Sequence, residues 1–147
     1  MEVILAKTAG FCFGVKRAVD TVYKEAGKEN VYTYGPIIHN EQVVSDLEKK
    51  GVSVLRTKEE LEHLEKGTVI IRSHGVAKEI YDLIEKKGLT LVDATCPFVK
   101  KIHKVVQKAS EEGKKIIIVG SAEHPEVEGI RGWCNGKVEI IANMEDV

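Results

Sequence analysis

Apolar residues along the chain follow two alternating patterns. Short runs rich in Val, Ile and Leu predict strands at 2–6, 31–35, 52–55, 68–72, 89–94, 115–120 and 137–142. Longer amphipathic stretches predict helices at 14–27, 40–50, 58–65, 77–87, 98–112 and 125–133. Several of these helices stop at a glycine, as at Gly51 and Gly88. This alternation predicts an α/β fold with mainly parallel sheets flanked by helices on both faces.

We expect two units along the chain. Residues 1–97 form a first α/β lobe that contains the first strand and the loop after it, and residues 98–147 form a second lobe. The predicted helix at 98–112 bridges the two lobes. The last segment, IANMEDV, is a strand followed by a helix start. We therefore expect the second lobe to be incomplete and the chain to be part of a longer protein.

Composition narrows the class of function. Charged residues make up 31% of the 147 residues but nearly cancel, to a net charge of -1, which argues against a nucleic-acid binder but not against a small anionic ligand. No apolar run approaches the roughly 20 residues of a membrane span, and the N-terminus lacks a signal-peptide pattern. We expect a cytoplasmic protein without a membrane partner, whose 3 cysteines form no structural disulfides.

Reactive side chains recur where predicted strands end. These residues are Cys12, His39, His74, Cys96, His124 and Glu126. The carboxyl ends of parallel strands meet at one edge of a sheet, which is where α/β proteins bind ligands. We therefore expect these side chains to converge there. The other two histidines, His63 and His103, lie within predicted helices and are expected to be solvated.

The residue types indicate the chemistry. Cys12 and Cys96 each precede a helix, where the thiolate is favoured, and thiolates are ligands for zinc or iron–sulfur clusters. Phe11 and Phe13 would shield such a centre. Three histidines are suited to a phosphate or diphosphate, and Glu126 is the carboxylate in the set that could deliver a proton. Taken singly, each residue also has an ordinary reading as a core cysteine, a capping histidine or a turn.

Five segments in order resemble the 4-hydroxy-3-methylbut-2-enyl diphosphate reductase family. They are GFCFGVKRA, GPIIHN, RSHGV, DATCPFVKKIH and HPEVEGIRGW. The resemblance implies a trefoil of three similar α/β lobes, of which this chain holds two. It also implies a 4Fe-4S cluster and an allylic diphosphate substrate, which is reductively dehydroxylated to isopentenyl and dimethylallyl diphosphate. An electron donor such as ferredoxin or flavodoxin is implied as well.

The same resemblance assigns roles to individual residues. Cys12 and Cys96 correspond to two cluster ligands. His39, His74 and His124 correspond to the diphosphate pocket, with His124 also close to the proton path. Glu126 corresponds to the proton-delivering acid.

The chain also departs from the family pattern. It has no match to the third cysteine ligand, the catalytic threonine or the Ser-x-Asn clamp of the family. The context of Cys134 matches no ligand motif, so we interpret it as a packing thiol at a helix end. We therefore expect little activity from these 147 residues alone. Two other hypotheses stay open: a non-catalytic diphosphate-binding module, and a zinc-binding structural domain.

Overall fold

A parallel sheet forms the centre of the first half of the chain. The computed structural model describes residues 2–146. Within them, β1 (Val31–Tyr34), β2 (Val52–Leu55), β3 (Thr68–Ile71) and β4 (Thr90–Asp93) form one sheet in the order β2-β1-β3-β4. Every neighbouring pair in this sheet is parallel. The predicted α/β class is confirmed.

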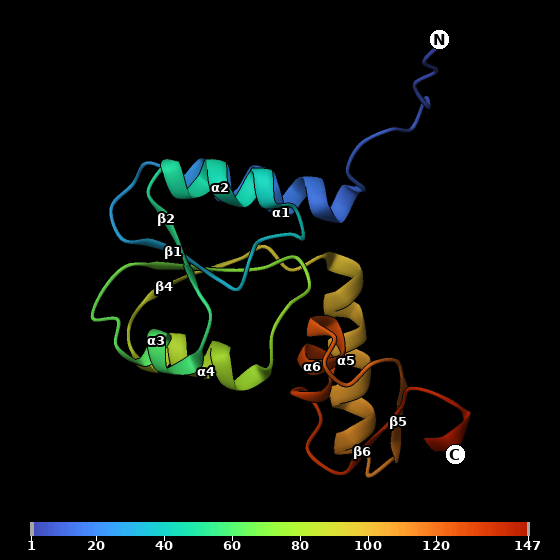
Figure 1. Ribbon diagram of the computed structural model, residues 1–147. Coiled ribbons are helices and arrows are strands. Elements are labelled where there is room, and N and C mark those ends of the chain that lie inside the picture. Colours follow the sequence, from blue (N-terminus) through green and yellow to red (C-terminus); the bar gives the residue numbers. More distant parts are fainter. Residues whose placement is uncertain (1, 147) are drawn as a thin grey trace.

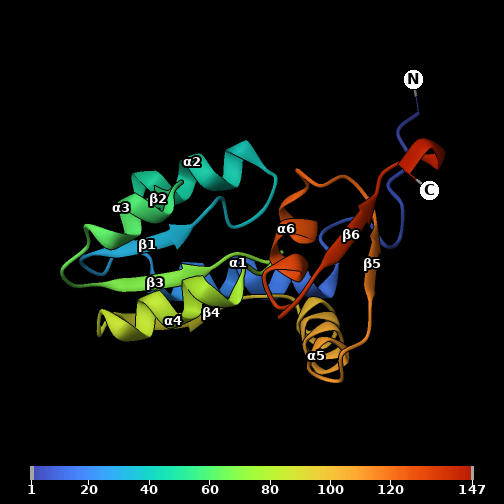
Figure 2. The same ribbon diagram turned by 90° about the horizontal axis from the view of Figure 1, so that it is seen from below.

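Helices cover both faces of this sheet (Figures 1 and 2). They are α1 (Phe13–Glu25), α2 (Glu41–Lys49), α3 (Lys58–Glu62) and α4 (Lys78–Lys86). The faces separate because side chains of a strand alternate in direction. Ile70 of β3 packs with Val22 of α1, whereas Val69 and Ile71 pack with Ile84 of α4. β3 is therefore buried on both sides, as expected for a central strand of a parallel sheet.

A second, smaller sheet follows helix α5 (Pro97–Glu111). It consists of the parallel strands β5 (Ile116–Val119) and β6 (Val138–Ile141), joined by α6 (Pro125–Arg131), and η1 (Met144–Asp146) follows. Ile117 and Val119 of β5 are 53% and 81% exposed. Helix α5 lies between the two sheets (Figure 2). Among residues 2–146, no helix is long and apolar enough to cross a bilayer.

The strand predicted at 2–6 does not form, so that prediction is wrong. The segment extends away from the body of the protein (Figure 1). Val3, Ile4 and Leu5 are each more than 80% exposed. A strand exists only if another strand accepts its hydrogen bonds, and no strand of the described chain pairs with this segment. Its apolar pattern alone was not sufficient.

Candidate active site

Two of the predicted histidines lie at the point where the strand order of the sheet reverses. The chain moves from β1 outward to β2 and then returns to add β3 on the other side of β1. The crevice at such a switch point is the usual ligand site of open α/β sheets. His39 follows β1 and His74 follows β3, and their ring centroids are 4.6 Å apart. The ring of His124, from the segment before α6, lies 6.4 Å from that of His74.

Backbone hydrogen bonds hold the loops of this site together beyond the ends of the strands. The N–H of Ser73 donates to the carbonyl of Ile37 at 3.2 Å, and the N–H of Cys96 donates to the carbonyl of Ser73 at 2.9 Å. The loops after β1, β3 and β4 are thereby joined in the same order as their strands. This ladder places His39, His74 and Cys96 in neighbouring loops, as the strand-end argument predicted.

His74 is the most perturbed member of the histidine cluster. Burial lowers its pKa to about 4, and the positive charges of His39, Arg72 and His124 act in the same direction. Its Nδ1 atom is buried and has no hydrogen-bond partner among the described residues. His74 is therefore neutral at pH 7 and has an unused polar atom. A bound anion would offset the neighbouring positive charges and raise the pKa of His74.

His124 and Glu126 are linked at the start of α6. His124 is the N-cap residue, and its Nδ1 accepts a hydrogen bond from the N–H of Glu126 at 3.2 Å. This contact fixes the direction of the His124 ring. His124 is exposed, whereas Glu126 is partly buried. The proton-delivering role of Glu126 stays a prediction.

The two predicted thiol ligands stand immediately before helices α1 and α5. Cys12 is the N-cap of α1 and Cys96 is the N-cap of α5, and neither side chain makes a capping hydrogen bond. A Cβ atom added at Gly14 would lie only 2.5 Å from Cys96 Sγ. The Cys96 thiol therefore packs directly against the first turn of the helix that Cys12 begins. Helix N-termini favour the thiolate, the form that binds metals.

The donor set fits a metal cluster in part. Cys12 is exposed and Cys96 is partly exposed, so both thiols are accessible as ligands. Within residues 2–146, no group of three or more His, Cys, Asp or Glu side chains is arranged to hold a metal ion. Phe11 and Phe13, expected to shield a cluster, are 49% and 67% exposed, so they enclose nothing among the described residues.

The two helix-borne histidines differ from each other. His63 is exposed at the end of α3, as predicted. His103 is only 3% exposed, so the prediction that it is solvated is wrong. It stacks on Trp133 with ring centroids 5.2 Å apart, and burial lowers its pKa to about 4.

The third cysteine behaves as a packing residue. Cys134 donates its S–H to the carbonyl of Ile130 at 3.7 Å. Burial raises the pKa of its thiol. Both observations agree with the interpretation of Cys134 as a thiol outside the ligand set.

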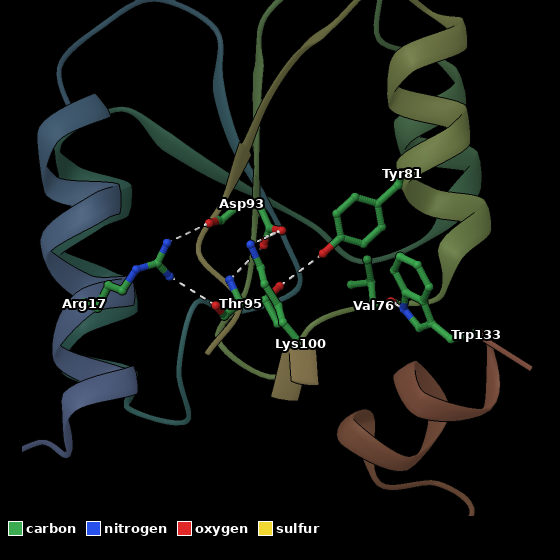
Figure 3. Close-up of polar contacts among 7 residues, drawn as sticks. All are labelled: Arg17, Val76, Tyr81, Asp93, Thr95, Lys100 and Trp133. Carbon is green, nitrogen blue, oxygen red and sulfur yellow. Dashed lines mark hydrogen bonds and ion pairs between the residues drawn. The ribbon is translucent and has the colours of Figure 1, made fainter. Parts of the chain in front are cut away.

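Sequence reasoning missed a polar network behind the Cys96 loop (Figure 3). Arg17 of α1 donates to the carbonyls of Asp93 and Thr95, and Tyr81 shares a hydrogen bond with the Thr95 hydroxyl. Arg17 lies in the first quoted segment, but its partners are 76 and 78 residues away. The sequence around Arg17 therefore does not predict these partners.

Comparison with known proteins assigns the family. A family model described as LytB protein matches residues 3–147. The chain belongs to the LytB protein family. It is 51% identical to the 4-hydroxy-3-methylbut-2-enyl diphosphate reductase of Caldanaerobacter subterraneus subsp. tengcongensis over 99% of this chain and 52% of that protein. It is 50% identical to the reductase of the same name from Geobacter metallireducens over 99% of this chain and 51% of that protein.

Solved structures agree with this assignment. The structure of (E)-4-hydroxy-3-methyl-but-2-enyl diphosphate reductase, the terminal enzyme of the non-mevalonate pathway, matches with a TM-score of 0.80 and 43% identity. The match covers 98% of this chain and 52% of that one. The Plasmodium falciparum E-1-hydroxy-2-methyl-but-2-enyl-4-diphosphate reductase matches with a TM-score of 0.87 and 33% identity over 95% and 44% of the two chains. This LytB-family chain spans about half the length of the curated relatives it matches.

Proposed function

We propose that this chain supplies the diphosphate pocket and two cluster ligands of a 4-hydroxy-3-methylbut-2-enyl diphosphate reductase. The observation that carries the proposal is the clustering of the three histidine rings at the switch point. The loops of His39 and His74 are hydrogen-bonded in turn to the Cys96 loop. A binding pocket for an anion and a thiol for a redox centre then share one edge of the sheet. The family membership of the chain supports the same reaction.

In this proposal each residue has a defined task. His39, His74 and His124 donate N–H groups to the diphosphate, and His74 does so as an uncharged imidazole. Cys12 and Cys96 would hold a 4Fe-4S cluster through their thiolates, and this cluster would supply the electrons of the reduction. Glu126, fixed beside His124 by its backbone N–H, supplies a proton to the departing hydroxyl.

The overall reaction is a two-electron reduction of the allylic alcohol. The allylic C–O bond breaks, and two electrons and two protons convert the alcohol into water and isopentenyl or dimethylallyl diphosphate. The electrons come from a protein donor such as ferredoxin or flavodoxin. A cytoplasmic location and the division into lobes at 1–97 and 98–147 belong to the same proposal.

Metal analysis tests the cluster assignment. The chain is reconstituted anaerobically with iron and sulfide, and iron and acid-labile sulfide are measured per chain. We expect both to be retained and to fall in Cys12→Ser and in Cys96→Ser. Cys134→Ser is the matched control and should retain as much iron as the parent, because we interpret Cys134 as a packing thiol whose S–H donates to the carbonyl of Ile130.

Other outcomes identify the alternatives. Iron content that does not change in the double variant Cys12→Ser/Cys96→Ser contradicts the proposal. Stoichiometric zinc without sulfide supports a zinc-binding structural domain. Binding of diphosphate by a chain that retains no iron supports a non-catalytic binding module.

A further inference from the structure

Thr95, the residue before Cys96, is held at each of its polar atoms. Its N–H donates to Asp93 Oδ1 at 2.9 Å, its hydroxyl lies 3.1 Å from the Tyr81 hydroxyl, and its carbonyl accepts from Arg17 at 3.1 Å. Thr95 is completely buried. The backbone directly before Cys96 is therefore held in a fixed position.

Asp93 reinforces this loop. Its carboxylate also pairs with Lys100 of α5 at 2.5 Å. Burial opposes the ionisation of Asp93, but the hydrogen bonds from Lys100 and Thr95 outweigh it, so its pKa lies below the usual value. These contacts lie within the β4–α5 segment, and they do not by themselves define where Cys96 sits relative to Cys12.

Arg17 makes the polar connection to the helix of Cys12. Its two terminal guanidinium nitrogens donate to the carbonyls of Asp93 and Thr95, at 3.3 Å and 3.1 Å (Figure 3). A guanidinium presents several donors in a fixed fork, so one side chain can hold two carbonyls at once. Arg17 lies one turn after Gly14 in α1, on the side that faces the Cys96 loop.

Gly14 makes the steric connection. The Cys96 thiol occupies the space that a side chain at this position would need, since a Cβ at Gly14 would lie 2.5 Å from Cys96 Sγ and 3.1 Å from Cys96 Cβ. Gly14 is buried within the first turn of α1. Alanine normally suits a helix better than glycine does, so the glycine is explained by the close approach of the thiol.

We propose that Arg17 and Gly14 are positioning residues that set the Cys96 thiol beside Cys12, Arg17 by holding the loop and Gly14 by leaving room for the sulfur. The importance of the thiol pair rests on the proposed function. The contacts that hold the Cys96 thiol against Gly14, two residues after Cys12, do not depend on that function. Neither residue would touch the substrate.

Bridging of the two thiols by dibromobimane, which becomes fluorescent when it links two thiols, tests this proposal. The metal-free chain is used in a Cys134→Ser background, which leaves Cys12 and Cys96 as its thiols. We expect efficient bridging in the parent and a bridged fraction lowered about fivefold in Arg17→Gln, because the effective concentration of one thiol near the other falls. Arg17→Lys should lie between the two, since an ammonium cannot span both carbonyls.

Lys16→Gln is the matched control. Lys16 is the neighbouring cation of α1 and pairs only with exposed Asp20 among the described residues. It should bridge as the parent does. Gly14→Ala is an independent second variant, which should also lower bridging because it displaces the sulfur. The fluorescence of Trp133, the sole tryptophan, shows whether each variant is folded.

The outcomes separate this proposal from the proposed function. Equal bridging in Arg17→Gln and Lys16→Gln, or no bridging in the parent, overturns the positioning role whatever the iron analysis gives. Reduced bridging in the variants together with iron content independent of Cys12 and Cys96 leaves the positioning role intact and overturns the cluster assignment.

Discussion

Cys12 and Cys96 both stand immediately before a helix, yet the chain holds them in different ways. Cys96 follows a paired strand, and its own N–H continues the hydrogen-bond ladder to Ser73. Cys12 follows a segment that pairs with no strand of the described chain, and residues 2–12 are exposed. Cys96 is thus held both by the hydrogen-bond ladder of the sheet and by contacts with α1, whereas Cys12 is held only as the residue before α1.

Around the two thiol loops, the largest expected effect comes from crowding Thr95, the residue before Cys96. Gly75 has a φ of +71°, and a Cβ there would lie 2.5 Å from His103 Cε1 and 3.0 Å from Thr95 Cγ2. Gly75→Ala should lower the free energy of unfolding by about 2–4 kcal/mol, because overpacking adds to the strain of a positive φ. Urea denaturation measures this change.

Gly88→Ala separates the cost of backbone strain from the cost of overpacking. Gly88 has a φ of +68° but nothing within 4 Å of an added Cβ. It should lose only about 1 kcal/mol from backbone strain. Equal losses at Gly75 and Gly88 would show that the packing behind Thr95 is not tight.

Acid should lower the stability of the folded chain, because it protonates His103, which is buried against Trp133. The pKa of buried His103 is about 4 in the folded chain, below the ordinary value of 6.5. The unfolded chain therefore binds the proton first, and stability is lost as the pH falls from 6.5 toward 4. His103 accounts for at most about 3.5 kcal/mol, at about 1.4 kcal/mol per pKa unit. His74 acts in the same direction.

Urea denaturation at several pH values measures this dependence. His103→Phe should reduce it, since the neutral aromatic ring cannot be protonated. His63→Gln is the exposed control and should leave it unchanged. An unaltered slope in His103→Phe would mean that this histidine is not kept neutral by the fold.

Thiol reactivity compares the two loops directly. Cys12 is exposed, whereas Cys96 is only partly exposed and packs against Gly14. In the metal-free chain, iodoacetamide should modify Cys12 about tenfold faster than Cys96 because access controls the rate. Mass spectrometry of the two peptides measures both rates in one sample. Equal rates would contradict the difference between the loops.

The smallest effect is expected in the segment before Cys12. Ile4 is 83% exposed, so Ile4→Ser should change the free energy of unfolding by no more than about 0.5 kcal/mol. Leu61→Ala, at a fully buried position, should cost about 2–5 kcal/mol under the same conditions. A large loss in Ile4→Ser would show that the N-terminal segment packs on the protein.

Much of the fold could be predicted because its signals are local. The strand predicted at 68–72 is observed at Thr68–Ile71, and the helix predicted at 98–112 is observed at Pro97–Glu111. Convergence of His39 and His74 followed from a general property of parallel strands. These inferences need only the periodicity of one segment and the direction of its neighbours.

The failures concern contacts between distant segments. The pattern at 2–6 matches a strand, but a strand depends on a partner that its own residues do not specify. His103 lies among lysines in VKKIHKVVQK, and this local pattern predicted a solvent-exposed side chain. Its burial depends on Trp133, which is distant in the sequence. The contacts of Arg17 are equally long-range, so no local pattern predicts them.

The central claim is that His39, His74 and His124 form an anion pocket at the switch point, and histidine NMR tests it most directly. Inorganic pyrophosphate is titrated into the chain while the ring signals of its 5 histidines are followed. The account predicts that the signals of these three residues shift together, that the pKa of His74 rises from about 4, and that His63 and His103 do not respond. Absence of any shift, or an equal response at His63, would contradict it.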